Sequence, residues 1–269
     1  MFCVQLVFGL LALASFPAPT GATADNYDSA GERELVRRLN EERVRAGLPA
    51  LASDDRLTEA ARVHAKLMAD RSQLSHQFPG EPAVRERLAE AKLRFNASGE
   101  NVAYDSDIAN AHQGLMVSPL HRANILSPKY NAVGIGVVHK GEVIYVAQDF
   151  AHVLETYSVQ QVQAMISQNL ARLRRQRRLQ PLREETSGGG DLRKKACLMA
   201  RNDRISAKAS DFPVTRAVVA YAVTQPEELV PQAIKMASEP NIQSYALGVC
   251  SAASRTYPSG AYWVLVLFK

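Results

Sequence analysis

The string Ser118-Pro119-Leu120-His121-Arg122-Ala123-Asn124-Ile125-Leu126 decides how the rest of this chain is interpreted. Three other elements line up with it in order: Leu74-Ser75-His76, Gly99-Glu100-Asn101, and a pair of β-rich runs at 133–137 and 145–150. A Gly-Glu-Asn string alone would be weak evidence for any protein family. Combined with the longer string at this distance, it is a specific signature, and the interpretation of the first half of the chain rests on it.

Two amphipathic helices are expected before these strings. Ser29 and Glu32 have the spacing of a capping box, and the apolar stripe that follows them stops at Gly47. A second helix is expected to begin near residues 53–55, where acidic side chains favour a helix N-terminus. His64 lies on the apolar face of this helix, which predicts a hydrogen-bonded packing residue rather than a ligand.

The periodicity changes after residue 100. Residues 101–104, 132–138 and 143–150 are β-rich, and the last two runs are joined by the four residues 139–142, which indicates a hairpin. A further helix is expected over 109–117. Helices followed by a hairpin predict an α+β fold with a largely antiparallel sheet.

Composition divides the chain into two parts. Its 269 residues are 46% hydrophobic, 22% charged and 7% aromatic, which excludes a disordered, collagen-like or coiled-coil protein. The formal net charge of +5 is uneven, because residues 25–151 carry −2 and residues 152–269 carry +7. All six histidines lie between positions 64 and 152. The two halves therefore differ in chemistry.

The chain begins with an apolar run from Phe2 to Phe16 that leads to Ala22-Thr23-Ala24. This pattern predicts a cleavable signal peptide over 1–24 and a secreted protein, extracellular or periplasmic, with no transmembrane segment. Export permits disulfides. Cys197 and Cys250 would remain in the mature chain, where either one disulfide or two buried thiols is compatible with the sequence.

The strings quoted above closely resemble the bacterial branch of the CAP superfamily, a secreted group that includes cysteine-rich secretory proteins, venom allergens (antigen 5) and plant pathogenesis-related proteins. The resemblance covers about residues 32–151. It implies a three-layer αβα sandwich with a cleft, in which two histidines and two acidic residues can hold a divalent metal. Carried over by position, these residues are His76, Glu100 and His121; the second acid falls on Ser118.

The resemblance therefore predicts a cleft lined by the residues His76, Glu100, Asn101, Ser118 and His121. Two imidazoles and a carboxylate form a three-ligand set suited to zinc. The sequence is compatible with bound zinc, with bound magnesium, or with a site that holds no metal. The alternative is that Glu100 and His121 pin neighbouring loops by hydrogen bonds. For Asn101 that alternative is favoured. His112, His139 and His152 are expected at the surface.

Residues 153–269 resemble a degraded copy of the first half. Leu48-Pro49-Ala50-Leu51 matches Leu179-Gln180-Pro181-Leu182 at an offset of 131, a helix matches at 135, and a strand matches at 117. These matches predict domains at 25–152 and 153–269, the second a smaller α+β unit without the cleft histidines. An unrelated α+β domain is the alternative.

A basic cluster is particular to the second half. It contains Arg172, Arg174, Arg175, Arg177 and Arg178. Because Arg174 and Arg177 would both enter the apolar stripe of their helix, the helix is expected to end near these residues. The cluster predicts a surface for anionic cell-wall polymer or lipid headgroups, or simply a solvated face. Nucleic acid is disfavoured, since no aromatic residue interleaves the arginines.

These observations predict a non-enzymatic binding or scaffold module at the cell envelope, with a small or polymeric ligand in the first-half cleft. The alternative is a metal-dependent hydrolase that uses His76, His121 and Glu100. Against it, the chain has no H-E-x-x-H motif and no Ser or Cys nucleophile with an obvious base. A third possibility makes the basic second half the working surface.

Overall fold

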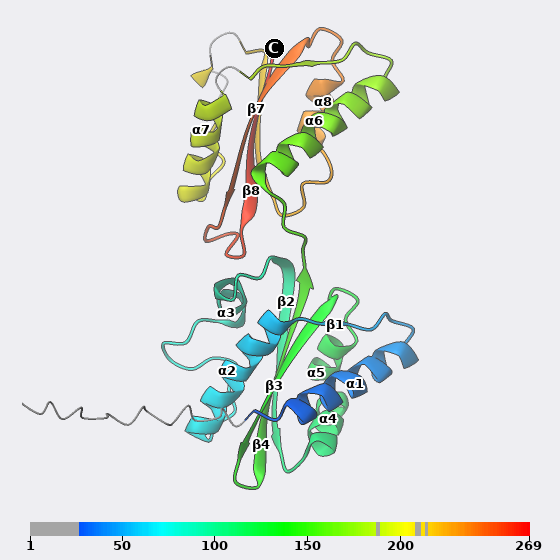
Figure 1. The fold of residues 1–269 in the computed structure, drawn as a ribbon, viewed down its shortest axis with the longest axis vertical. Coiled ribbons are helices and arrows are strands. Elements are labelled where there is room, and N and C mark those ends of the chain that lie inside the picture. Colours follow the sequence, from blue (N-terminus) through cyan, green and yellow to red (C-terminus); the bar gives the residue numbers. More distant parts are fainter. Residues whose placement is uncertain (1–26, 187–188, 208–210, 213–214) are drawn as a thin grey trace, which may run out of the picture.

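The computed structural model describes residues 27–186, 189–207, 211–212 and 215–269, so the predicted signal peptide at 1–24 lies outside the described residues. Two four-stranded sheets lie one above the other along the long axis, and each has helices on both faces (Figure 1). In the described ranges, no helix is long and apolar enough to cross a membrane.

The first sheet has the strand order β1-β3-β4-β2. Only β1 runs parallel to its neighbour, and the other pairs are antiparallel. The strands are β1 (Ala52–Ser53), β2 (Phe95–Asp105), β3 (Ala132–Lys140) and β4 (Val143–Val153). The helices α1 (Ser29–Arg45), α4 (Ile108–Val117) and α5 (Pro119–Ile125) pack on one face, and α2 (Asp55–Arg71) and α3 (Val84–Glu90) on the other. This arrangement confirms the predicted three-layer αβα sandwich.

Short polar side chains fix where the first helices begin. Asp28 caps α1, because its Oδ1 accepts a hydrogen bond from the Gly31 amide at 2.8 Å. The capping box expected at Ser29 is therefore wrong by one residue. Asp54 caps α2 as expected, and α1 ends just before Gly47, whose φ of +74° suits a residue without a Cβ.

The Val-Gly-Ile-Gly-Val run of β3 allows α2 to lie directly on the sheet. A Cβ on Gly134 would lie 2.1 Å from the backbone of Leu57, and a Cβ on Gly136 would lie 2.4 Å from the amide of Arg62. No side chain fits in that space. The two glycines therefore set the distance between α2 and β3 and, through it, the position of the loop that follows α2.

The second sheet repeats the order and directions of the first, as β5-β7-β8-β6 with only β5 parallel to its neighbour. The strands are β5 (Arg183–Glu184), β6 (Ala217–Val223), β7 (Ser244–Ala252) and β8 (Ala261–Phe268). The helices α6 (Val159–Gln176) and α8 (Pro231–Ala237) cover one face, and α7 (Gly189–Arg201) covers the other. This is the expected smaller α+β unit.

A buried arginine occupies the same place in both halves. Arg43 in α1 donates to the carbonyls of Pro49, Ile125 and Ser127. Arg174 in α6, 131 positions later, donates to the carbonyls of four residues: Gln180, Ala237, Glu239 and Ile242. Arg174 is 2% exposed and lies inside the helix, which continues to Gln176. Its assignment to an exposed basic patch is therefore wrong, because backbone carbonyls surround its guanidinium.

The ends of α2 and α7 also correspond at 131 positions. Ser72 and Asp203 follow these helices with φ of 50° and 48°, and each donates its amide to a carbonyl three residues earlier. Leu192, beside Gly248, thus corresponds to Ala61, beside Gly136. The offset of 135 expected for this helix is wrong by one helical turn, because an apolar stripe looks alike after four residues.

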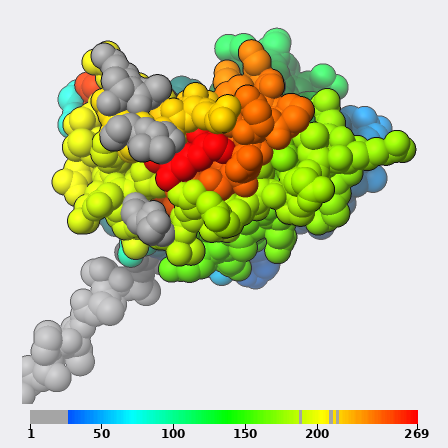
Figure 2. All heavy atoms as spheres, turned by 90° about the horizontal axis from the view of Figure 1, so that it is seen from above, coloured from blue at the N-terminus to red at the C-terminus, as the bar shows by residue number. Residues whose placement is uncertain are grey.

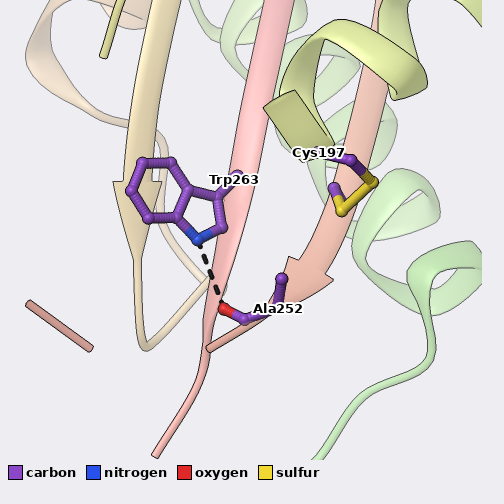
Figure 3. The surroundings of a disulfide bond; sticks show 4 residues. Cys197, Ala252 and Trp263 are labelled. Carbon is purple, nitrogen blue, oxygen red and sulfur yellow. Dashed lines mark hydrogen bonds between the residues drawn. A yellow bond between two sulfur atoms is a disulfide. The ribbon is translucent and has the colours of Figure 1, made fainter. Parts of the chain in front are cut away.

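Cys197 and Cys250 form a disulfide between α7 and β7, with Cα atoms 5.2 Å apart (Figure 3). Of the two possibilities left by the sequence, the structure has the disulfide. Nearby on β8, Trp263 donates its Nε1 hydrogen to the carbonyl of Ala252. The bridge ties α7 to the sheet.

Arg94 joins the two halves. Its guanidinium donates to the carbonyls of Glu155 and Thr224 and to the hydroxyl of Tyr262, and lies 4.4 Å from the centre of the Tyr262 ring. Glu155 belongs to the connection between the halves, while Thr224 and Tyr262 belong to the second half. One side chain of the first half thus holds both the connection and the second sheet.

Candidate functional site

The predicted site residues come from three separate elements. Glu100 and Asn101 lie on β2, at the edge of the first sheet, His76 lies in the loop after α2, and His121 lies in α5. His76 Nδ1 is 2.9 Å from Glu100 Oε1. The fold therefore brings together two residues that are 24 positions apart, with the imidazole of His76 exposed and the carboxylate of Glu100 buried.

Glu100 is held by a buried ion pair that the sequence analysis missed. Its Oε2 contacts the guanidinium of Arg87, which also lies 3.4 Å from Glu81. Glu81 in turn binds His64 Nδ1 at 2.6 Å, and His64 Nε2 contacts the carbonyl of Ser75. His64 is thus the buried packing residue that was expected. Arg87 lies in a stretch without any recognised motif, so no sequence signal could have identified it.

His76 and His121 have pKa shifts of opposite direction. The hydrogen bond to Glu100 raises the pKa of His76. Burial lowers the pKa of His121, and the nearby charge of His76 lowers it further. The site therefore offers one imidazole that is protonated more readily than usual, and one that stays neutral more readily.

An amide network positions His121. Asn101 is buried, and its Nδ2 donates to the carbonyl of His121 and to Gln148 Oε1, both at 3.1 Å. Its own Oδ1 accepts from Asn124 Nδ2 at 2.9 Å. Asn101 therefore supports α5 rather than facing a ligand, while Ser118, at the start of α5, is partly exposed.

The side chains as arranged do not fit a metal ion. Both oxygens of Glu100 are engaged, one by His76 and the other by the cationic Arg87. Over the described ranges, no three His, Cys, Asp or Glu side chains come together to hold a metal. Zinc or magnesium would have to displace a buried guanidinium, which is unfavourable because it leaves Arg87 without its partner.

Asp149 lies beside Glu100, its register partner on β4. It is fully buried, and neither of its oxygens has a hydrogen-bond donor in the described part of the chain. Burial, and then the charge of Glu100, raise the pKa of Asp149 well above its ordinary value. In the sequence, Asp149 could have been identified as a candidate site residue because it is an acidic residue within an otherwise largely apolar strand. Such a buried, uncompensated carboxyl is typical of functional sites.

Asp149→Asn is expected to stabilise the protein at neutral pH. Because the folded-state pKa of Asp149 is raised, its contribution to the free energy of unfolding is favourable below the ordinary value of 3.8 and is lost as pH rises through the folded-state pKa. The neutral amide avoids this loss, by roughly 1–2 kcal/mol. Urea unfolding at pH 7 and pH 4 measures the difference, which should shrink at pH 4. Asp70→Asn, at a 61% exposed side chain, is the control; equal destabilisation at both pH values contradicts the prediction.

The remaining histidines lie away from this site. His112 is buried on α4, where burial lowers its pKa, so its expected surface position is wrong. His139 is exposed near the β3–β4 turn and contacts Asp28 at 3.1 Å. His152 is partly exposed at the end of β4.

A second candidate surface lies at the end of α6, which forms a projecting corner of the second half (Figures 1 and 2). Arg172, Arg175, Arg177 and Arg178 are exposed there. Residues 159–176 contain no Asp or Glu, whereas the arginines of α1 pair with acids on their own helix. Among described residues, these four arginines make no ion pair, so the corner is a concentrated positive charge.

Comparison with known proteins supports the interpretation of the first half. Residues 36–160 match the cysteine-rich secretory protein family, CAP. The uncharacterized protein YkwD of Bacillus subtilis is 30% identical over 125 residues, which cover 46% of this chain and 49% of that protein. The uncharacterized membrane protein YlbC of the same organism is 32% identical over 120 residues, or 44% of this chain and 34% of that protein. The chain thus spans at most about half of these relatives.

One solved structure is similar to this chain over a comparable stretch. The extracellular protein containing a SCP domain from Bacillus anthracis is 31% identical, with a TM-score of 0.43, over 46% of this chain and 41% of that one. Residues 36–160 of this chain therefore carry a CAP domain, which is similar in sequence to CAP proteins of bacteria.

Proposed function

We propose that this CAP-domain protein is a secreted, non-enzymatic binding or scaffold module of the cell envelope, extracellular or periplasmic. The proposed domains are a signal peptide at 1–24, a CAP domain at 25–152 and a degenerate copy at 153–269. The ligand, small or polymeric, contacts the imidazoles of His76 and His121 and the hydroxyl of Ser118.

The fixed carboxylate of Glu100 carries this proposal. Because one oxygen binds Arg87 and the other binds His76, the carboxylate orients an exposed imidazole and is not free to act as a base or metal ligand. A side chain held by a buried partner is suited to recognition, since little conformational entropy is lost on binding. The sequence offers no Ser or Cys nucleophile with an obvious base, which favours binding over hydrolysis.

The matching placement of Arg43 and Arg174 supports the proposal that the second half is a degenerate copy. Both halves share strand order, strand directions and the two left-handed helix ends described above. Glu100, opposite Asp149, corresponds to Val218, opposite Leu267, so the strand offset is 118 rather than the expected 117. Residues 153–269 contain no histidine. The copy therefore retains the scaffold and has lost the ionisable site.

The exposed arginines at the end of α6 are proposed to bind anionic cell-wall polymer or lipid headgroups. Unpaired guanidinium groups attract phosphate-bearing polymers over the range of the Debye length, about 8–10 Å at moderate salt. The patch consists of Arg172, Arg175, Arg177 and Arg178. Binding through it is expected to weaken steeply with salt.

Co-sedimentation with bacterial cell-wall sacculi, with and without their anionic polymer, tests both surfaces. The parent protein is expected to sediment with the wall, and His76→Ala/His121→Ala to bind at least tenfold more weakly at every salt concentration. A variant with glutamine at the four exposed arginines is expected to lose only the salt-sensitive part. Binding that neither variant weakens overturns the proposal.

Calorimetry with zinc and magnesium tests the hydrolase alternative directly. The engaged carboxylate of Glu100 predicts that neither ion binds at His76 and His121. Zinc binding to the parent that disappears in the His76→Ala/His121→Ala variant would instead favour the metal-dependent hydrolase.

A further inference from the structure

Strand β6 is an edge of the second sheet. Lys269, next to β8, exchanges both backbone hydrogen bonds with Ser244 of β7. Because bonding directions alternate along an antiparallel strand, even-numbered residues of β8 face β6, and their partners in β6 are odd-numbered. The amides and carbonyls of Val218, Ala220 and Ala222 therefore point away from the sheet.

The equivalent edge of the first sheet is covered by side-chain donors. Asn124 Nδ2 donates to the carbonyl of Glu100 at 3.1 Å, and the hydroxyl of Tyr130 donates to the carbonyl of Ser98 at 3.3 Å. Arg43 donates to the carbonyl of Ile125 as Arg174 does to that of Ala237, so Ala237 is the equivalent of Ile125. By the same offset, Met236 is the equivalent of Asn124, and Ile242 is the equivalent of Tyr130.

The side chains of Met236 and Ile242 have no hydrogen-bond donor. The outward carbonyls of β6 therefore lack the side-chain donors that cover the edge of β2. Within the described ranges, no hydrogen bond is made to the outward groups of Val218, Ala220 or Ala222. A row of free backbone groups on an edge strand is a template for another strand.

A cavity of about 540 Å³ runs along this edge. Five consecutive residues of β6, Val218 to Ala222, line it, so the strand backbone itself forms one wall. Trp263, Tyr257 and Ala207 line the cavity on the side of α7, and Gln232 of α8 lines the other side. The space beside the free edge thus accommodates side chains of an added strand.

The charged residues that line this cavity indicate which kind of partner would bind there. Of the two charged lining residues, Asp203 already accepts from the amide and hydroxyl of Thr256, while Arg204 is exposed and makes no ion pair in the described residues. A carboxylate is the natural partner of Arg204. A second copy of this chain is disfavoured, because residues 152–269 carry +7 and would repel each other.

We propose that β6 binds an extended peptide segment of a partner protein, which adds a strand to the second sheet. The segment carries an acidic residue opposite Arg204 and apolar side chains at alternate positions that enter the cavity. Backbone hydrogen bonds to Val218, Ala220 and Ala222 supply affinity, and the cavity supplies selectivity. The inference depends on the correspondence between the halves and not on the function proposed for the first half.

Fluorescence of Trp263, the only tryptophan of the chain, provides the readout. The probe is a blocked seven-residue peptide of alternating Val and Thr with a central Glu, titrated into the full-length protein. Saturable binding is expected, at least tenfold weaker for the same peptide N-methylated at alternate residues, which cannot pair with a strand edge. A probe that does not bind up to 1 mM overturns the proposal.

Ala220→Pro is the matching protein variant. Proline is tolerated on edge strands where its missing N–H faces outward, so the fold is retained while the added strand is blocked. Ala220→Ser, which keeps the amide, is the control and should bind as the parent does. Equal binding by Ala220→Pro, with unchanged circular dichroism, contradicts strand addition. A parent dimer that Ala220→Pro converts to monomer shows that the occupant is a second copy, and also overturns the proposal.

Discussion

Arg174→Ala is expected to lower the free energy of unfolding of the second half by about 3–4 kcal/mol. The guanidinium is 2% exposed and donates to the carbonyls of Gln180, Ala237 and Glu239, so its removal leaves several buried carbonyls without donors. Urea unfolding followed by the fluorescence of Trp263, which lies in this half, measures the loss.

Arg175→Ala is the matched control, because its side chain is exposed one position further along the same helix. It should change the free energy of unfolding by no more than about 0.5 kcal/mol. Arg43→Ala should destabilise the first half as Arg174→Ala does the second, since its guanidinium makes the equivalent bonds. Similar small effects of Arg174→Ala and Arg175→Ala would show that the buried guanidinium is dispensable.

Loss of the disulfide should have a comparable effect. The bond between Cys197 and Cys250 closes a loop with a sequence separation of 53, for which chain entropy predicts about 4 kcal/mol of stabilisation. Cys197→Ala/Cys250→Ala is therefore expected to unfold at a clearly lower urea concentration than the oxidised parent.

A reducing agent separates the effect of the bond from that of the substitutions. The parent protein should fall to about the stability of Cys197→Ala/Cys250→Ala when reduced, while the double variant should not respond to the reagent. If the reduced parent unfolds at the same urea concentration as the oxidised parent, the bond contributes nothing to stability.

Much of the first half could be predicted because its signals are local. The Val-Gly-Ile-Gly-Val run, the hairpin and the helix before Ser118 each report on neighbouring backbone, and the structure has all of them. The pairing of His76 with Glu100 came from the resemblance alone, since only the folded chain brings these residues together.

The failures at Arg174, Arg87 and His112 have a common physical cause, which is that a polar residue in an apolar position has no visible partner in the sequence. Arg174 was taken for a surface residue because its acceptors at Ala237 and Glu239 lie more than 60 positions away. The same holds for Arg87, whose partner Glu100 lies on another element, and for the burial of His112. Sequence periodicity identifies which face of a helix is buried, but it does not identify the residues that pack against that face.

Arg94 has a mechanical consequence for the whole chain. Turning one half against the other would break three hydrogen bonds of one guanidinium at once and separate it from the ring of Tyr262. Arg94 therefore restrains the connection at residues 154–158 and opposes a rotation between the halves. This contact therefore keeps the imidazoles of the first half and the free edge of β6 at a nearly constant distance from each other.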